Sequence, residues 1–375
     1  MGRRGHGEGS IYQRKKDGRW VAAIMLENHK RKYIYGDTRR EVQEALKKAL
    51  HEQQQGTLST GPQQTLKVYL ERWLEQVCKL TMRPNTYNQY RSIVRRHLVP
   101  ALGSIKLEKL TPERIQSFCA QKQDEGLSAK TVVIIHGVLS SALDNAFKWG
   151  LIPRNVARLV SLPRIERYEA QTLTVGQALK LLGVARGSRI EALLLVALTT
   201  GMRRGELLAL RWEDIDLEAS ILHVRRTVNP ITGLGYKEGE PKSKAGRRKI
   251  VLSEVTIEAL KEHRQGQEQV RARVGARWQE HGIVFCNKYG GFFNPTTVLN
   301  AFKKLLRDAG LPDIRIHDLR HSAATILAAA RVDLKTIQER LGHSSIAITA
   351  DIYSHVSADM QQEAAGKIDS LFRRS

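Results

Sequence analysis

Apolar and polar residues alternate in three short stretches near the start of the chain, at 10–15, 19–26 and 30–36. Alternation with a period of two predicts strands, and the turn-forming triplets KDG and ENH separate these three. Residues 38–56 then repeat apolar positions every three or four residues, between an N-capping threonine and a glycine, which predicts a helix. The pattern therefore predicts a small sheet of three strands with one helix.

Helical spacing continues through the next hundred residues. Four stretches carry it, at 66–78, 86–102, 111–126 and 128–150. Thr111-Pro112 and Ser128 are typical helix starts, because proline suits the first turn and a serine hydroxyl caps free backbone N–H groups. Four helices with short connections predict an all-α bundle.

The last part of the chain predicts a mainly α, mixed α+β domain. Its helical stretches lie at 174–185, 189–200, 204–211, 254–273, 295–309, 318–330, 333–341 and 345–355. Two stretches, 220–228 and 247–253, read as strands. They bracket the glycine-rich residues 229–246, which we expect to form a loop or an extended hairpin.

Two polar stretches, 56–64 and 161–172, interrupt these patterns and read as linkers. We therefore expect a multidomain protein: a small β-sheet plus helix over 1–58, a helical bundle over 64–162 and a mixed domain over 170–375. Met360, Ala364, Ile368 and Leu371 recur at helical spacing, which predicts an amphipathic tail helix at the end of the last domain.

Charge is the feature of the composition that bears most on function. The chain carries 61 Lys and Arg against 38 Asp and Glu, a net charge of +23. The excess is spread over its length, with +6 in residues 1–60, +9 in 61–168 and +8 in 169–375. A partner that is a polyanion along its whole length fits this distribution, and nucleic acid is the natural one.

Other bulk features narrow the class of protein. The longest apolar run, 192–200, is too short to span a bilayer, and the N-terminus lacks the apolar core of a secretory signal. Cys78, Cys119 and Cys286 are isolated, which favours neither a disulfide framework nor a zinc site. We expect a cytoplasmic protein with no membrane association.

Four places in the last two hundred residues carry groups suited to chemistry. Arg203 and Arg204 follow an apolar helix, and Lys242 and Lys244 precede a predicted strand. His317 and Arg320 lie three apart at a predicted helix start, so they share one face. His343 and Tyr353 stand in LGHSSIAITADIYSH. Each has a plain structural reading: a capping arginine, a solvated hairpin tip, a packed histidine or a half-buried tyrosine.

A metal site is a weaker reading of the same residues. His317 and His321 have the i,i+4 spacing of a zinc-binding helix, but no glutamate stands between them in the required place. No third ligand cluster accompanies them. The sequence therefore predicts neither a bound metal nor any other cofactor.

Together the four places meet one chemical requirement, nucleophilic attack on a phosphodiester without metal. Two arginines offer forked donors to the non-bridging oxygens, where charge grows in the transition state. A lysine can protonate the leaving 5′ oxygen, and histidine can move protons near neutrality. A tyrosine can form a covalent ester with the phosphate, which conserves the energy of the broken phosphodiester bond for rejoining.

The motifs TTGMRRGE (199–206), HDLR (317–320), LGH (341–343) and a tyrosine in ADIYSH resemble, in order and spacing, those of the tyrosine recombinases of the phage integrase family. The resemblance covers residues 170–357. It extends to 65–160, similar to the family's core-type DNA-binding domain, and to 10–55, similar to the arm-binding domains of integrases of phage lambda and conjugative transposons.

The resemblance implies roles for individual residues. The catalytic set it implies is Arg203, Lys244, His317, Arg320, His343 and the nucleophile Tyr353, with Glu206 supporting Arg203. Lys242 remains the alternative to Lys244. Basic and aromatic residues of the first two domains are expected to bind DNA: Arg19, Trp20, Tyr33, Arg83, Arg95 and Arg96.

The resemblance also implies an activity: a site-specific integrase that cleaves and rejoins DNA through a 3′-phosphotyrosyl intermediate and a Holliday junction, for a phage or mobile element. It implies a homotetramer on core-type and arm-type sites of double-stranded DNA, near the nucleoid of a bacterial host, with an excisionase and a DNA-bending host protein as further partners. Two alternatives are a type IB topoisomerase-like enzyme and a non-catalytic DNA-binding regulator of the same fold.

Overall fold

The computed structural model describes residues 9–25, 31–54, 64–166, 171–231, 235–241, 244–346, 349–350 and 372. The chain divides into two compact units, Met1–Arg167 and Tyr168–Ser375. Tyr353, Lys242 and the predicted tail helix lie outside the described residues. No helix among the residues that are described is long and apolar enough to cross a membrane.

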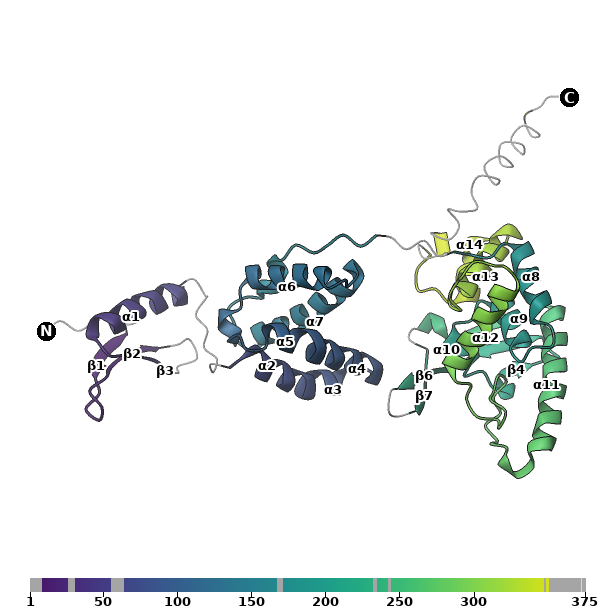
Figure 1. Ribbon diagram of the computed structural model, residues 1–375, viewed down its shortest axis with the longest axis horizontal. Helices are drawn as coiled ribbons and strands as arrows, with labels where there is room; N and C mark the ends of the chain where they lie inside the picture. Colours follow the sequence, from purple (N-terminus) through teal and green to yellow (C-terminus); the bar gives the residue numbers. More distant parts are fainter. Residues whose placement is uncertain are drawn as a thin grey trace. The chain divides into compact units, whose positions relative to one another are not determined.

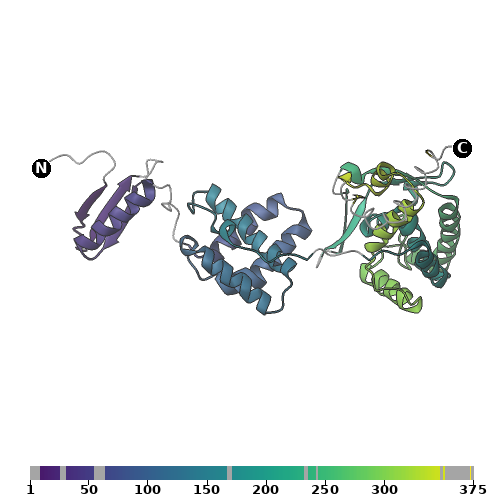
Figure 2. The ribbon, with the colours of Figure 1, turned by 90° about the horizontal axis from the view of Figure 1, so that it is seen from above.

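The first unit begins with the predicted sheet and helix. Strands β1 (Ser10–Gln13), β2 (Trp20–Met25) and β3 (Arg31–Gly36) pair antiparallel in that order, and α1 (Arg39–Gln54) lies against one face (Figure 2). Because side chains alternate between faces, Ala22 and Ile24 meet Val42 and Leu46 of the helix in a small core.

The helical part of the first unit has its own hydrophobic core, which contains Trp73, Leu98 and Leu139. Its helices are α2 (Leu66–Trp73), α3 (Lys79–Thr81), α4 (Pro84–Ile93), α5 (Val99–Leu102), α6 (Pro112–Asp124) and α7 (Ala129–Lys148). Short π-helical turns, Leu74–Cys78 and Val94–Leu98, join α2 to α3 and α4 to α5. Each of the first two predicted helices is therefore one continuous helix with a wider turn in its middle. The hydroxyls of Thr111 and Ser128 cap α6 and α7 as predicted.

The second unit is built round α9 (Glu191–Thr200), which is apolar on nearly every side and is accordingly buried. Helices α8 (Val175–Ala185), α11 (Glu254–Val274) and α13 (Asp318–Ala329) pack against it (Figure 1). The remaining helices are α10 (Arg204–Leu207), α12 (Pro295–Asp308) and α14 (Leu334–Leu341).

Two small sheets accompany these helices. Strands β4 (Ile215–Asp216), β5 (Ile221–Val224) and β8 (Arg248–Val251) form one, in the order β4-β5-β8. Strands β6 (Thr227–Ile231) and β7 (Gly235–Gly239) form a separate hairpin. The extended hairpin expected within residues 229–246 is therefore present, and its return leg leads to the turn Lys244–Gly246 that precedes β8.

Two predicted elements have the wrong bounds. The strand expected over 220–228 is divided between two sheets, because Arg225 and Arg226 turn aside to bind the buried carboxylate of Asp214. The helix expected over 204–211 ends at Leu207, because the chain then straightens so that Arg211 pairs with Ile283 in an isolated β-bridge. The other described helices agree with prediction to within a few residues.

Candidate active site

Arg203 is held in place by the way α9 ends. Gly201 adopts a left-handed conformation with φ of 63° and stops the helix, so Arg203 stands just before α10. Its Nη1 donates to Glu206 Oε1 at 2.8 Å, and its backbone N–H donates to Oε2 of the same carboxylate at 3.0 Å. Arg203 Nη2 donates to the carbonyl of Gly342 at 3.2 Å, and 38% of its side chain stays exposed.

Glu206, which is only 2% exposed, joins Arg203 to a second arginine. Arg248 Nη2 donates to Glu206 Oε2 at 3.0 Å. Burial alone would raise the pKa of this carboxyl, but the charge of Arg248 and the hydrogen bonds from both arginines outweigh burial and lower the pKa. Glu206 is therefore an anion that supports two cations.

Arg320 is the third arginine of the site and is 3% exposed. Its Nη1 donates to the carbonyl of Gly201 at 2.8 Å, whereas its Nη2 is buried with no hydrogen-bond partner among the described residues. Burial, together with the charges of Arg203 and Arg248, lowers the pKa of Arg320 to about 9. Because a buried cation is costly without a counter-charge, Arg320 is suited to bind an anion.

Three histidines face the arginines. His317 and His321 stand edge to face with ring centroids 5.7 Å apart, and the pKa of each is lowered, chiefly by burial. His343 Nδ1 lies 2.9 Å from Thr349 Oγ1, and Nε2 has no hydrogen-bond partner among the residues that the structure describes. Burial and then the charges of Arg320 and Arg203 lower the pKa of His343 to about 3, so its ring is neutral near pH 7.

The end of α14 brings the LGH motif against the turn Lys244–Gly246. Gly342 closes the helix with φ of 68°, and a Cβ there would lie 2.5 Å from the carbonyl oxygen of Ala245. Only glycine tolerates both that conformation and that approach. Residues 244–246 and 342–343 are thus neighbours, although about a hundred residues separate them in sequence.

The predicted catalytic residues accordingly fall into two groups. Arg203, Glu206, His317, Arg320 and His343 come together in the second unit, linked by the hydrogen bonds and the mutual electrostatic effects described above. The backbone of Lys244 lies in the turn beside them. Lys242 and Tyr353 are outside the described residues.

Arg248 and His321 are the site residues that sequence reasoning missed. Arg248 follows an equally basic neighbour in a run of charged residues, where a solvated strand start is the ordinary reading. Its burial with Glu206 depends on contacts far apart in sequence, which no local pattern reveals. The i+4 spacing of His321 from His317 did place the two histidines on one face of α13, as the structure has them.

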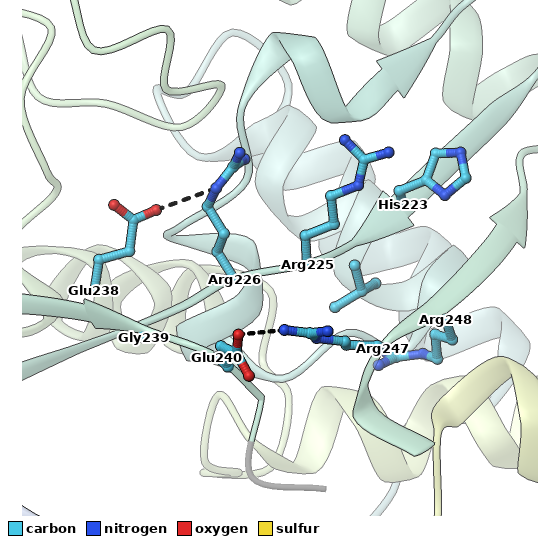
Figure 3. A pocket seen from close by; sticks show the side chains of 9 residues that line it. His223, Arg225, Arg226, Glu238, Gly239, Glu240, Arg247 and Arg248 are labelled. Carbon is cyan, nitrogen blue, oxygen red and sulfur yellow. Dashed lines mark ion pairs between the residues drawn. The ribbon is translucent and has the colours of Figure 1, made fainter. Parts of the chain in front are cut away.

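A cavity of about 840 Å³ lies at the foot of the β6–β7 hairpin. Figure 3 shows Arg225, Arg226, Arg247 and Arg248 around it, with Glu238 and Glu240 ion-paired to Arg226 and Arg247. Glu238 also accepts from Arg211 Nη2 at 2.8 Å. Arg248 is therefore shared between this cavity and the Glu206 cluster.

The DNA-binding residues expected in the first unit have different surroundings. Arg83, Arg95 and Arg96 are exposed on the helical bundle. Tyr33 is 44% exposed on the sheet face that α1 leaves open. Trp20 lies on the other face, packed on the core with Arg39 over its ring, and the exposed Arg19 is 3.8 Å from Asp37.

Comparison with known proteins gives the family of the chain. A model described as "Phage integrase family" matches residues 171–360, and one described as "Phage integrase, N-terminal SAM-like domain" matches residues 65–122. A protein named "Tyrosine recombinase XerC-like" from Caldanaerobacter subterraneus subsp. tengcongensis is 31% identical over 361 residues, 91% of this chain and 92% of that protein. The chain belongs to the phage integrase family.

Solved structures of integrases have the same fold as this tyrosine recombinase. A Tn1549 transposon integrase in complex with a circular intermediate DNA superposes with a TM-score of 0.69 at 22% identity, covering 81% of this chain and 99% of that one. A lambda integrase tetramer bound to a Holliday junction gives a TM-score of 0.58 at 19% identity, covering 93% and 96%. The predicted multidomain recombinase fold is confirmed. As a family member, the protein is an enzyme that breaks and rejoins DNA.

Proposed function

We propose that this tyrosine recombinase integrates or excises a mobile element, and that Arg203, Lys244, His317, Arg320, His343 and Tyr353 carry out the chemistry. The observation that carries the proposal is the buried Nη2 of Arg320, which has no hydrogen-bond partner among the described residues. A buried cation beside two further arginines and one carboxylate needs another anion. A phosphodiester supplies that anion.

The proposed cleavage step balances as follows. The Tyr353 hydroxyl attacks the scissile phosphorus, a new phosphotyrosyl bond forms at the 3′ end, and the bond to the 5′ oxygen breaks. Lys244 gives its proton to that oxygen, while the tyrosine proton passes to His317, a proposal supported by the electrostatic effect of the nearby Arg320 on this histidine. Rejoining reverses each step, so no external energy source is required.

The arginines act on the transition state in this proposal. Guanidinium donors from Arg203 and Arg320 meet the non-bridging oxygens, whose charge grows as the pentacoordinate centre forms. His343, neutral with Nε2 available, adds a hydrogen bond to the same phosphate. Removal of one such donor typically costs on the order of 10²–10³ in rate.

The rest of the chain would position DNA. We infer three functional parts, 1–58, 64–162 and 170–375. In the second part, Arg83, Arg95 and Arg96 would contact the DNA sugar-phosphate backbone at core-type sites. Separate hydrophobic cores for the sheet and for the bundle support the first division. Arg19 and Tyr33 would serve a second, arm-type site, whereas Trp20 supports the fold of that part.

The proposed assembly is a homotetramer that exchanges strands through a Holliday junction, with an excisionase and a DNA-bending protein setting direction. The fold shared with the lambda integrase tetramer supports this assembly. A type IB topoisomerase-like activity is the alternative, and it would relax supercoils without exchanging partners.

The deciding experiment is to trap the covalent intermediate on a nicked core-site duplex. Wild-type protein should form an adduct that survives denaturation, and Tyr353→Phe should bind the duplex with unchanged affinity but form none. Arg320→Ala should bind nearly as well and cleave about 10²-fold more slowly. A normal adduct from the Phe variant would overturn the assignment, and relaxation without recombinant products would favour the topoisomerase alternative.

A further inference from the structure

Arg248 holds three separate segments of the second unit with one guanidinium. Its Nη2 donates to Glu206 Oε2 at 3.0 Å, its Nε to the carbonyl of Arg340 at 2.6 Å, and its Nη1 to the carbonyl of Gly246 at 3.2 Å. These acceptors belong to α10, to the last turn of α14 and to the turn Lys244–Gly246. The turn carries Lys244, α10 directly follows Arg203, and α14 ends two residues before His343.

Arg248 is buried, and its surroundings are closely packed. Its side chain is 6% exposed, and Glu206 is its ion-pair partner. Gly342 packs against it, since a Cβ there would lie 3.0 Å from Arg248 Cδ and 3.1 Å from Nη1. A buried arginine with one carboxylate is costly to maintain unless its other N–H groups are satisfied, and here two carbonyl groups that no helix or sheet uses accept them.

The geometry points to Arg248 as a positioning residue for the cleavage reaction. We infer that it fixes the Lys244 turn relative to Glu206, and hence relative to Arg203, so that the general acid and the transition-state donors meet the same phosphate. This role rests on the proposed function. Its three described hydrogen bonds all go to the protein, so in this proposal Arg248 acts on the substrate through the segments that it holds.

A planar fork is essential to this role. Different nitrogens of the guanidinium bind the three acceptors, so the donor directions are fixed relative to one another. A lysine at the same place would keep a positive charge near Glu206, but a single ammonium could not reach Gly246 and Arg340 as well. Arg248→Lys therefore separates the charge of the residue from its ability to hold the turn.

The test compares two nicked core-site duplexes in single-turnover cleavage by the full chain, one with the normal bridging 5′ oxygen and one with sulfur in its place. A thiolate leaves without protonation, so a misplaced general acid no longer matters on the sulfur substrate. Arg248→Lys should bind both duplexes within twofold of wild type. It should cleave the oxygen substrate about 10²-fold more slowly, and the sulfur substrate within threefold of wild type.

Two further variants separate this role from a general structural one. Glu206→Gln weakens the support of Arg203 as well as the anchor of Arg248, so it should slow cleavage of the sulfur substrate too, which Arg248→Lys should not. Arg247→Gln is the matched control, because it removes a neighbouring, exposed charge that pairs with Glu240 instead. Its two cleavage rates should stay within twofold of wild type.

The outcomes decide the inference. Equal loss on both substrates for Arg248→Lys, or full activity on the oxygen substrate, would overturn it. Selective rescue by sulfur would establish it, because a protein that had only lost stability would cleave both substrates more slowly. If wild-type protein forms no Tyr353 adduct on either substrate, the proposed function fails instead, so the two failures are distinguishable.

Discussion

At the scale of single residues, His343 links the charge of the site to pH. Its folded-state pKa, lowered to about 3 by burial and by Arg320 and Arg203, lies below the value of about 6.5 for an unfolded histidine. The unfolded chain therefore binds the extra proton first. The stability that the neutral ring contributes is present above pH about 6.5 and is lost as pH falls toward 3.

We expect the urea midpoint of the DNA-free protein to fall between pH 7 and pH 4, and to fall less steeply in His343→Gln. The difference between the two slopes of urea midpoint against pH isolates His343, because the lowered pKa values of His317 and His321 contribute to the slopes of both proteins. The His343 ring signal in NMR should stay at its neutral position down to about pH 4. A titration centred near pH 6.5 in the free protein would contradict the expectation.

At the scale of elements, the end of α9 sets the position of Arg203 and Arg320, the two arginines proposed to be catalytic. Gly201 has φ of 63°, its carbonyl accepts from Arg320, and a Cβ would lie 2.1 Å from Leu341 Cδ2. An alanine there would be strained by its conformation and would also push against α14. Gly187, with φ of 74° and nothing within 4 Å of its Cβ position, offers the conformational effect alone.

Gly187→Ala should therefore destabilise the protein by about 1 kcal/mol, the usual cost of a left-handed alanine. Gly201→Ala should cost clearly more, and it should also slow cleavage by displacing Arg320 and the LGH motif. Urea unfolding and single-turnover cleavage of both variants measure this difference. Equal destabilisation by the two substitutions would mean that α14 moves away from the added Cβ at no cost in stability.

The elements also show what a sequence can predict here. Helices α8, α12 and α14 were predictable because their apolar spacing and their capping residues Thr174, Asn294 and Asp333 agree with their burial. The hairpin and the divided strand depend on the ion pairs of Glu238 and Asp214 with arginines elsewhere in the sequence. Motif order was enough to propose Arg203, Glu206, Arg320 and His343, whereas Arg248 required the fold, because its three partners lie 2, 42 and 92 residues away.

At the scale of the whole molecule, positive charge is distributed over every part of the chain. We expect deletion of residues 1–58 to leave cleavage of core sites intact and to remove affinity for a second, distal class of site, because β1–β3 and α1 have their own core. Footprinting of full-length and truncated protein across the whole attachment region measures this. Identical footprints would show that the sheet binds no separate site.

The shared carboxylate of Glu206 also constrains how such a site can vary over evolutionary time. Loss of Glu206 leaves Arg248 buried without its counter-charge and Arg203 without its carboxylate partner, and loss of Arg248 leaves two carbonyl groups without their donor and Glu206 Oε2 with only the Arg203 N–H. Neither single substitution is therefore expected to be neutral. Drift at positions 206 and 248 should therefore occur jointly, and a library that randomises both together should recover active pairs that two single-site libraries miss.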